Sequence, residues 1–274
     1  MIIPDTEQVA QIIREVAAEE IMPRFRKLAD HEVSHKQKPG DLVTIADIES
    51  ERRLSERLTR LAPDTVVVGE EGTDADPSLL LALNGDRPAW VVDPVDGTAN
   101  FAKGKACFAV IVGYCRGGKT LAGWIFDPIT DCMAWAVAGQ GAWLSGPKGT
   151  RRLEVAPPQD VFHMTGSLGY RLASQIRKKR QTGLEPVPGN IIRYGCTGRE
   201  YMDLARGLLD FAQYTRLKPW DHAAGILIHA EAGGYSRMTD TGLPYRPEPR
   251  VQRNTVLVAR DKACWTDLLS ALMP

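Results

Sequence analysis

Two aspartates, Asp93 and Asp96, follow a short apolar run in this 274-residue chain and are spaced for joint chemistry. They belong to the segment DPVDGTANF, which comes directly after AWVV. Pro94 fixes its own φ at about −65° and keeps the segment out of a helix, so both carboxylates can point at one site with the Val95 carbonyl oxygen between them. Gly97 then permits a sharp turn. Asp-Pro-x-Asp-Gly is also a common turn sequence, but the whole pattern predicts a site for a hard divalent cation.

Other acidic residues lie where strands or helices are expected to begin or end. Glu70 and Glu71 follow the apolar run TVVV, Asp47 falls in the first turn of an expected helix, and Asp221 opens another. Each one alone is also explained as a helix cap or a charge that complements the helix dipole, but this does not account for two strands that both end in acids. A set of oxygen ligands favours Mg²⁺ or Mn²⁺ over zinc. We expect His222, beside Asp221, to pack or to support a neighbour.

The residues directly after Asp96 suit a phosphate group. The backbone amides of Gly97 and Thr98, at the start of a helix, can donate hydrogen bonds to phosphate oxygens, and the Thr98 hydroxyl can orient a water molecule. Divalent cations that share phosphate oxygens with a substrate neutralise its charge, lower the pKa of a bound water and stabilise the leaving alkoxide. The acids and the Gly-Thr pair together predict metal-assisted hydrolysis of a phosphate ester.

Hydrophobic periodicity predicts the elements that hold these residues in the first half of the chain. An amphipathic helix should start after Asp5, with Gln8 completing a capping box, and a second should run from Thr44 to Pro63 with Asp47 in its first turn. Short β-branched runs then predict strands. These strands should cover residues 65–71, 89–97, 108–114 and 120–128, and residues 133–146 should continue the same meander.

The composition changes at residues 145–152, where SGPKGTRR predicts a boundary between two lobes. The expected first lobe, residues 1–146, combines two N-terminal helices with an antiparallel sheet and holds most of the metal ligands. In the second lobe, residues 147–274, strands and helices alternate, which favours an α/β arrangement with the substrate loop and the last metal ligand. Its expected strands are 162–167, 190–195, 211–215 and 255–260, and its helices are 171–180, 201–209, 221–232 and one that closes the chain.

Composition narrows the class of protein. Lys plus Arg and Asp plus Glu both total 34, so no net field attracts nucleic acid or an anionic membrane surface. The five cysteines are scattered without Cys-x-x-Cys spacing, which disfavours a disulfide framework and a zinc site. The N-terminal residues are too charged for a signal peptide, and no window approaches the ~18 apolar residues of a membrane span. We therefore expect a cytoplasmic protein with reduced thiols.

Four segments resemble the sequence blocks of one enzyme family. KQKPGDLVTIAD, VVVGEEG, DPVDGTANF and KPWDHAAGILIHAEAGG occur in the order, and at about the separation, of the blocks of the inositol monophosphatase-like phosphatases, and GQGAWLSG resembles a further block. The resemblance extends from the first helix to the end of the chain. It implies a layered αβαβα sandwich of the sugar-phosphatase type, a homodimer, and Mg²⁺-dependent hydrolysis of the phosphate monoester of a small metabolite.

The resemblance also implies the metal ligands. Glu70, Asp93 and the carbonyl oxygen of Val95 would bind one Mg²⁺. Asp93, Asp96 and Asp221 would bind a second, so that Asp93 bridges the two ions. Two or three ions per site are expected, with Mn²⁺ as an alternative to Mg²⁺.

Catalytic roles follow from the same resemblance. Asp47 and Thr98 would position and deprotonate the attacking water, and Glu71 would support the surrounding water network. The amides of Gly97 and Thr98 would hold the phosphate. No covalent phosphoenzyme is required.

The segment RYGCTGRE resembles the family's substrate loop. It implies contacts with the alcohol part of the ester from Gly195, Cys196 and Thr197. Seven residues before the metal-binding aspartate, inositol phosphatases carry a glutamate that binds ring hydroxyls, whereas this chain has Tyr214 as the substrate-binding residue. The change leaves the substrate open among inositol phosphate, histidinol phosphate, sugar phosphates and 3′-phosphonucleotides. Arg216 and Lys218 are candidates either for binding a second anionic group or for solvated loop cations.

Three other interpretations need different local structures. Residues 113–120, GYCRGGKT, match the P-loop of NTPases letter for letter, but that loop must lead into a helix, and the strand expected after the Gly-Gly turn predicts a hairpin. A cysteine-based phosphatase needs its arginine further along the phosphate loop than Arg199 lies from Cys196. The basic run 177–180 suggests an RNA-binding protein, but without interleaved aromatic residues we expect a solvated helix end and no nucleic-acid partner.

Overall fold

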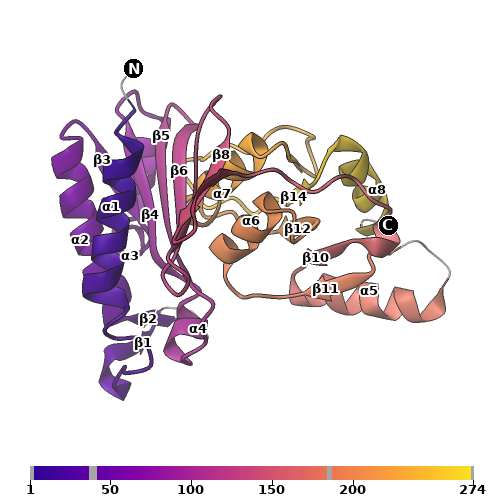
Figure 1. Ribbon diagram of the computed structural model, residues 1–274, viewed down its shortest axis with the longest axis horizontal. Coiled ribbons are helices and arrows are strands. Elements are labelled where there is room, and N and C mark those ends of the chain that lie inside the picture. The colour runs from indigo at the N-terminus through magenta and orange to yellow at the C-terminus, as the bar shows by residue number, and fades with distance from the viewer. Residues whose placement is uncertain (1–2, 37–41, 184–186, 273–274) are drawn as a thin grey trace.

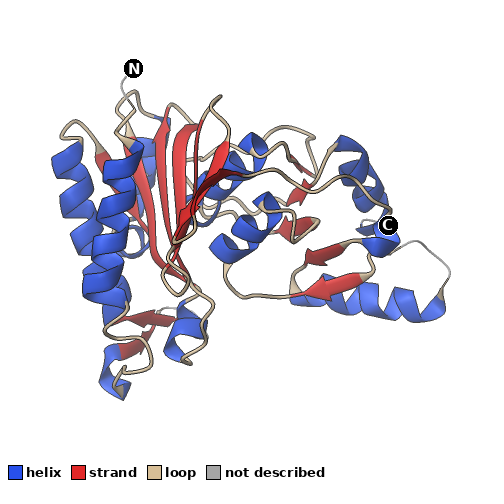
Figure 2. Ribbon diagram, viewed as in Figure 1, coloured by secondary structure: helices blue, strands red, loops and turns tan. Residues whose placement is uncertain are grey.

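The computed structural model describes residues 3–36, 42–183 and 187–272 of the chain. Residues 37–41, which belong to the KQKPGDLVTIAD segment, lie outside the described residues. Helices and two sheets alternate in layers from left to right in Figure 1, and Figure 2 separates the two kinds of element. The layers are α1 (Thr6–Val16) with α2 (Ile45–Leu61), a seven-stranded sheet, α6 (Thr197–Ala205) with α7 (Pro219–Glu231), a five-stranded sheet, and α5 (Tyr170–Thr182) with α8 (Lys262–Leu272). This order confirms the expected αβαβα sandwich.

Strands and short helices complete the fold. The first sheet contains β3 (Val66–Gly69), β4 (Ala89–Asp96), β5 (Ala109–Arg116), β6 (Lys119–Asp127), β7 (Cys132–Val137), β8 (Ala142–Gly146) and β9 (Gly149–Arg152). The second contains β10 (Thr165–Ser167), β11 (Asn190–Ile192), β12 (Phe211–Tyr214), β13 (Tyr235–Met238) and β14 (Val256–Ala259). Outside the sheets lie the short helices α3 (Glu70–Ala75) and α4 (Thr98–Ala102) and the ribbon of β1 (Val33–His35) and β2 (Leu42–Thr44). Among the described residues, the helices are too short or too polar to span a bilayer.

Side-chain caps start the first two helices where the sequence predicts them. The Asp5 carboxylate accepts a hydrogen bond from the Gln8 amide at 2.9 Å and caps α1. At α2, Thr44 and Asp47 form a capping box, in which the Asp47 carboxylate accepts from the Thr44 amide at 2.8 Å. The helix ends before Pro63, as expected. The same cap leaves Asp47 Oδ1 3.1 Å from Thr98 Oγ1, at the start of α4.

The first sheet has the order β3-β4-β5-β6-β7-β8-β9. β5 and β6 form the predicted hairpin, with Arg116 paired to Lys119 across the Gly-Gly turn. The expectation of an antiparallel sheet is wrong for one pair, because β3 and β4 run parallel. The chain between them crosses over through α3 and a 3₁₀ segment, Pro77–Asn84, and a connection of that length can return it to the same edge of the sheet.

The sheet continues past residue 146. Gly146 pairs with Gly149 at the turn of a β8–β9 hairpin, so SGPKGTRR is a turn and its flanking strands, since glycine and proline serve turns as well as linkers. The division into lobes 1–146 and 147–274 stays a prediction. Buried residues of both parts pack in one cluster, with Ile111 of the first sheet, Tyr201 of α6 and Val258 of the second sheet among them.

The second sheet has the order β11-β10-β12-β14-β13, with β10 parallel to β11 and β12 and the other pairs antiparallel. Two helices differ in their bounds from the sequence-based expectation. α6 begins at Thr197 instead of residue 201, and α7 begins at Pro219, so that Asp221 lies inside its first turn. Proline is favoured at the first position of a helix because its missing N–H would have no intrahelical partner there.

Helix α7 lies directly against its neighbours on both sides. A Cβ on Gly123 of β6 would lie 2.8 Å from the Cα of Ala224, and one on Gly225 would lie 2.1 Å from Cδ2 of Tyr201 on α6. Side chains larger than hydrogen do not fit at these two positions without displacing the backbone or a buried ring. The contacts therefore fix the first turn of α7, and with it Asp221, relative to the first sheet.

Candidate active site

Three carboxylates from distant parts of the sequence meet between β4, α3 and α7. Glu70 is the first residue of α3, Asp93 lies in β4, and Asp221 lies in the first turn of α7. One carboxylate oxygen from each residue lies within 4.8 Å of the other two. Glu70 and Asp93 are buried, and Asp221 is partly buried. A single cation could therefore contact all three.

The end of β4 has an irregular backbone that presents both of its aspartates. The pairing of β4 with β5 shifts between Asp93 and Asp96, and the Asp93 carboxylate accepts a hydrogen bond from the Val95 amide at 3.1 Å. Gly97 follows with a φ of 88°, a left-handed conformation that favours glycine, and α4 begins at the next residue. The sharp turn predicted from DPVDGT is thus present, and the strand includes both aspartates, as the expected range 89–97 does.

Burial disfavours negative charge on the carboxylates of this cluster. It raises the pKa of Asp93 well above its usual range, with added repulsion from Glu70 and other acids, and it raises the pKa of Asp221 to about 8. Burial acts in the same direction on Glu70, but the nearby Lys218 and Lys36 ammonium groups outweigh it and lower the pKa of that carboxyl. A divalent cation would offset both the repulsion and the burial cost, so these residues fit a metal.

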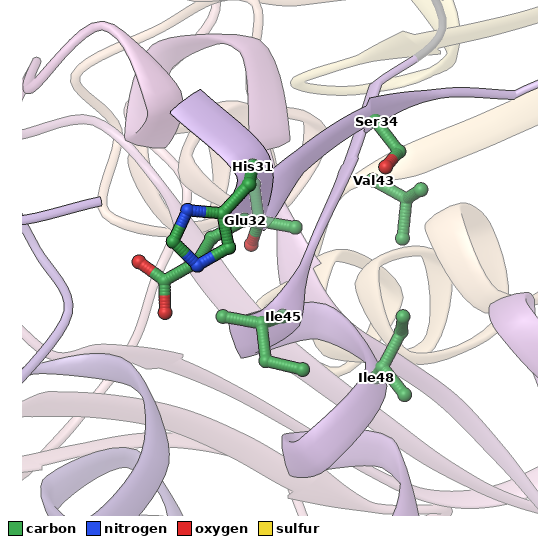
Figure 3. Close-up of a pocket in the computed structure, with 7 residues that line it drawn as sticks. His31, Glu32, Ser34, Val43, Ile45 and Ile48 are labelled. Atoms are coloured by element: carbon green, nitrogen blue, oxygen red, sulfur yellow. The ribbon is translucent and has the colours of Figure 1, made fainter. Parts of the chain in front are cut away.

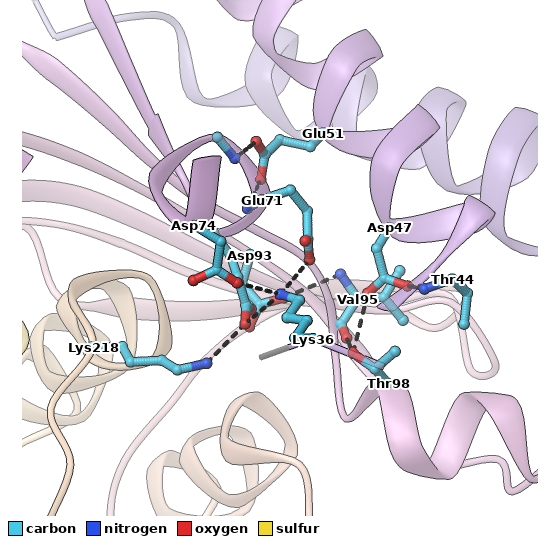
Figure 4. Close-up of polar contacts among 12 residues, drawn as sticks. Lys36, Thr44, Asp47, Glu51, Glu71, Asp74, Asp93, Val95, Thr98 and Lys218 are labelled. Atoms are coloured by element: carbon cyan, nitrogen blue, oxygen red, sulfur yellow. Dashed lines mark hydrogen bonds and ion pairs between the residues drawn. The ribbon is translucent and has the colours of Figure 1, made fainter. Parts of the chain in front are cut away.

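Two lysines contact the cluster through Glu70, and Figure 4 shows both pointing toward the acids. Lys218 Nζ lies 2.7 Å from Glu70 Oε1, and Lys36 Nζ lies 3.1 Å from the same atom. Lys36 Nζ also lies 2.8 Å from Glu71 and 3.0 Å from Asp74. Lys218 is therefore not a solvated loop cation, and its binding of a second anionic group stays a prediction. The part played by Lys36 was missed, because its place in the sequence, at the start of KQKPGDLVTIAD, does not indicate which acid it contacts.

Glu51 of α2 fixes the start of α3. Its carboxylate accepts hydrogen bonds from the amides of Glu71 at 2.8 Å and Gly72 at 2.7 Å. A Cβ on Gly69 would lie 2.2 Å from Glu51 Cδ, which explains the glycine in VVVGEEG. Burial raises the pKa of Glu71 to about 8, although Lys36 opposes the shift. Sequence reasoning missed Glu51, since the glycine that accommodates it is the only local signal.

Asp47 and Thr98 lie together, as the resemblance implies. Asp47 Oδ2 accepts from the Thr44 amide at 2.8 Å and from the Thr44 hydroxyl at 2.6 Å. Thr98 Oγ1 lies 3.1 Å from Asp47 Oδ1 and 3.0 Å from the Val95 carbonyl oxygen, and its one proton can serve either acceptor (Figure 4). Burial raises the pKa of Asp47 to about 6. This carboxylate is therefore oriented on one side and able to take up a proton near neutral pH.

Asp96 connects β4 to α6. Its Oδ2 accepts hydrogen bonds from the Gly198 amide at 2.6 Å and from the Cys196 thiol at 3.0 Å. Its oxygens are not among those of Glu70, Asp93 and Asp221 that lie within 4.8 Å of one another. Its part as a metal ligand stays a prediction.

Two cavities adjoin the cluster. One, of about 170 Å³, is lined by metal-site residues that include Glu70, Asp93, Val95, Gly97, Thr98 and Lys218. The other, of about 250 Å³, is lined by all four expected substrate residues, Gly195, Cys196, Thr197 and Tyr214. Asp96, Gly195 and Asp221 border both cavities. A third cavity, of about 280 Å³, lies at β1, β2 and the start of α2 and is lined by apolar side chains such as Ile45 and Ile48 together with polar ones such as His31 and Glu32 (Figure 3).

One of the alternative interpretations does not fit the structure. GYCRGGKT forms the β5–β6 hairpin, so the P-loop interpretation is wrong, because no helix follows the glycines to hold a phosphate. Residues 177–180 lie near the end of α5, where Arg177, Lys178 and Arg180 are exposed and Lys179 is partly buried. His222 is buried, its Nδ1 lies 3.1 Å from the Tyr201 hydroxyl, and burial lowers its pKa to about 3, which agrees with a packing role.

Taken together, the layered fold and an all-carboxylate cluster beside a pair of small polar cavities define a phosphatase, a phosphoric monoester hydrolase. The sequence profile of the inositol monophosphatase family matches residues 5–272, and the chain belongs to that family. Over 207 residues it is 34% identical to inositol-1-monophosphatase SuhB of Mycobacterium tuberculosis, an alignment that covers 74% of this chain and 71% of that protein.

Two further comparisons agree with this assignment. The chain is 29% identical over 234 residues to the fructose-1,6-bisphosphatase/inositol-1-monophosphatase of Aquifex aeolicus, with 83% of each protein covered. The solved structure of a Thermotoga maritima IMPase superposes with a TM-score of 0.80 at 22% identity, over 96% of this chain and 94% of that one. At that identity the structural likeness shows the shared fold.

Proposed function

We propose that this chain hydrolyses a small phosphate monoester by direct attack of water and requires Mg²⁺ held by Glu70, Asp93 and Asp221. The observation that carries the proposal is the convergence of these three carboxylates to within 4.8 Å in a largely buried site. Mg²⁺ prefers oxygen ligands and shares phosphate oxygens with substrates. A related structure that superposes with a TM-score of 0.77 is described as an IMPase/NADP phosphatase complexed with Mg²⁺ and phosphate.

Further ligands lie within the same cavity. The carbonyl oxygen of Val95 and the carboxylate of Asp96 belong to residues that line it, and we assign them to the two or three Mg²⁺ ions expected per site. Mn²⁺ has the same ligand preference and is the alternative ion. When bound, the ions would neutralise the phosphate dianion and lower the pKa of a bound water.

The side chains of this chain would then guide the water. The Thr98 hydroxyl, by donating to Asp47 or to the Val95 carbonyl, leaves its own oxygen free to accept a hydrogen bond from the water. Asp47 takes up the proton as the water oxygen forms its bond to phosphorus and the ester P–O bond breaks. The alcohol leaves and gains its proton from solvent. The amides of Gly97 and Thr98, at the turn into α4, are assigned to the phosphate oxygens.

The alcohol part of the ester is assigned to the 250 Å³ cavity lined by Gly195, Cys196, Thr197 and Tyr214. Curated relatives are named for inositol-1-monophosphate and fructose-1,6-bisphosphate, and both esters are candidate substrates here. Histidinol phosphate and 3′-phosphonucleotides complete the panel. A homodimer and a cytoplasmic location stay predictions.

Phosphate release tests this proposal. Wild-type protein and Asp93→Asn should be assayed with the four classes of ester, in Mg²⁺ and after chelation. Asp64→Asn, at an exposed position, is the matched control. We expect turnover of at least one ester by the wild type and the control in Mg²⁺ alone, and no turnover by Asp93→Asn despite a folded chain. A near-wild-type rate in Asp93→Asn, or activity that survives complete chelation, would refute the metal role.

A further inference from the structure

Glu200 is a buried acid that the proposed chemistry does not use. It lies on α6, three residues after Thr197, and its relative exposure is 5%. The Ser167 hydroxyl donates a hydrogen bond to Glu200 Oε1 at 2.6 Å. Within the described part of the chain, the ion pairs found do not include one to Glu200, and the neighbouring Arg199 is engaged by Asp127.

A carboxylate in this position is costly to the fold. Burial without a cation disfavours the ionised form, and burial raises the pKa of Glu200 to about 7. A glutamine could accept the same hydrogen bond from Ser167 at a lower cost. A buried acid in a cavity is a frequent mark of a ligand contact.

The cavity beside Glu200 is built from polar groups. Ser167 and Tyr214 lie at the carboxyl ends of the neighbouring strands β10 and β12, which run parallel, and ligands commonly bind at such ends. Together with Glu200 they line the 250 Å³ cavity that borders Asp96 and Asp221. A phosphate held by the carboxylate cluster would therefore place its alcohol next to Glu200.

We infer that Glu200, oriented by Ser167, determines specificity by accepting a hydrogen bond from a hydroxyl group on the alcohol part of the ester. The inference rests on the proposed phosphatase function and names its substrate class, phosphate monoesters of polyols, cyclitols or sugars. Arg193 and Arg216 line the same cavity beside the acids Asp96, Glu200 and Asp221, so its lining carries both signs of charge.

Glu200→Gln is the decisive variant, because it keeps the size of the side chain and removes its charge. The probes are myo-inositol 1-phosphate, fructose 1,6-bisphosphate, histidinol phosphate and 4-nitrophenyl phosphate, whose leaving group has no hydroxyl beyond the ester oxygen. Hydrogen bonds to charged groups contribute enough to change kcat/KM by about tenfold or more. We expect that loss for the better of the two hydroxylated esters, mainly through KM, and less than about a twofold change for 4-nitrophenyl phosphate, which offers no such hydrogen bond.

Two further variants separate recognition from folding. Ser167→Ala should raise KM for the hydroxylated ester, as Glu200→Gln does, because it removes the hydrogen bond that orients the carboxylate. It should leave KM for 4-nitrophenyl phosphate unchanged. Glu56→Gln, at an exposed position on α2, should change neither rate. The melting temperature of each variant should be measured by thermal unfolding. For Glu200→Gln it should be at or above that of the wild type.

The outcomes distinguish this inference from the proposed function. Equal losses on all esters, or no loss on any, would overturn the role of Glu200 while the phosphatase stands. Hydrolysis of the aryl ester or histidinol phosphate in preference to both hydroxylated esters would overturn the substrate class. If the wild type released phosphate from none of these four probes and from no 3′-phosphonucleotide, the proposed function would fail and the inference would fall with it.

Discussion

Asp221→Asn should make the metal-free protein more stable while it removes activity. Burial raises the pKa of the Asp221 carboxyl from 3.8 to about 8. When the pKa of a carboxyl is higher in the folded than in the unfolded protein, the protein keeps its full stability at pH values below the unfolded pKa. It loses stability as the pH rises toward the folded pKa. A difference of one in pKa between the folded and unfolded states corresponds to about 1.4 kcal/mol. Between pH 3.8 and pH 7 the free energy of unfolding of the wild type therefore falls by at most about 4 kcal/mol. The variant with an uncharged asparagine at this position does not show this fall.

Urea unfolding followed by circular dichroism can measure this difference. With a chelator, the free energy of unfolding of Asp221→Asn should exceed that of the wild type at pH 7 by up to about 4 kcal/mol, and the two should converge near pH 4. Added Mg²⁺ should stabilise the wild type and leave the variant unchanged, because the ion binds the folded site. A variant that is equally or less stable than the wild type at pH 7 without metal would refute the electrostatic reasoning.

Three further outcomes follow from other parts of the structure. The value of kcat/KM should fall as the pH drops below about 6, because burial raises the pKa of Asp47 to about 6 and a protonated Asp47 cannot accept a proton. A flat profile of kcat/KM from pH 5 to 8 would contradict the role of Asp47 as proton acceptor. Gly225→Ala should lower the free energy of unfolding by about 1 to 3 kcal/mol, since its Cβ would lie 2.1 Å from the Tyr201 ring. Urea unfolding of this variant beside Gly169→Ala, where no atom lies within 4 Å of the added Cβ, tests it. Lys119→Met should leave phosphate release unchanged. If the wild type bound ATP tightly and this variant did not, the P-loop interpretation would be restored.

The sequence predicted the elements that depend on local rules. The caps at Asp5 and Thr44 and the Gly-Gly hairpin all rest on hydrogen bonds or backbone angles within a few residues, and the structure confirms them. The parallel pairing of β3 with β4 and the β8–β9 hairpin were not predicted, because strand direction depends on where a crossover returns the chain, and a Gly-Pro segment can serve a turn or a linker.

The candidate site, too, contains residues that local sequence patterns indicate and residues that they do not. Acids that follow apolar runs indicated Glu70 and Asp93, and Asp221 came from the family resemblance together with its place at a helix start. Lys36, Glu51 and Glu200 were missed because their meaning depends on a partner far away in the sequence. A lysine or a glutamate in isolation carries no local signal for the residue it will contact in the fold.

The raised pKa values of Asp93 and Asp221 have a consequence for the way in which the ion is loaded. Burial raises the pKa of Asp93 well above its usual range and that of Asp221 to about 8, so near neutral pH both carboxyls hold protons before the ion binds. An ion that binds these oxygens must displace the protons, because a carboxylate binds a metal in its ionised form. Loading should therefore release protons to the solvent, and the affinity for the ion should rise with pH.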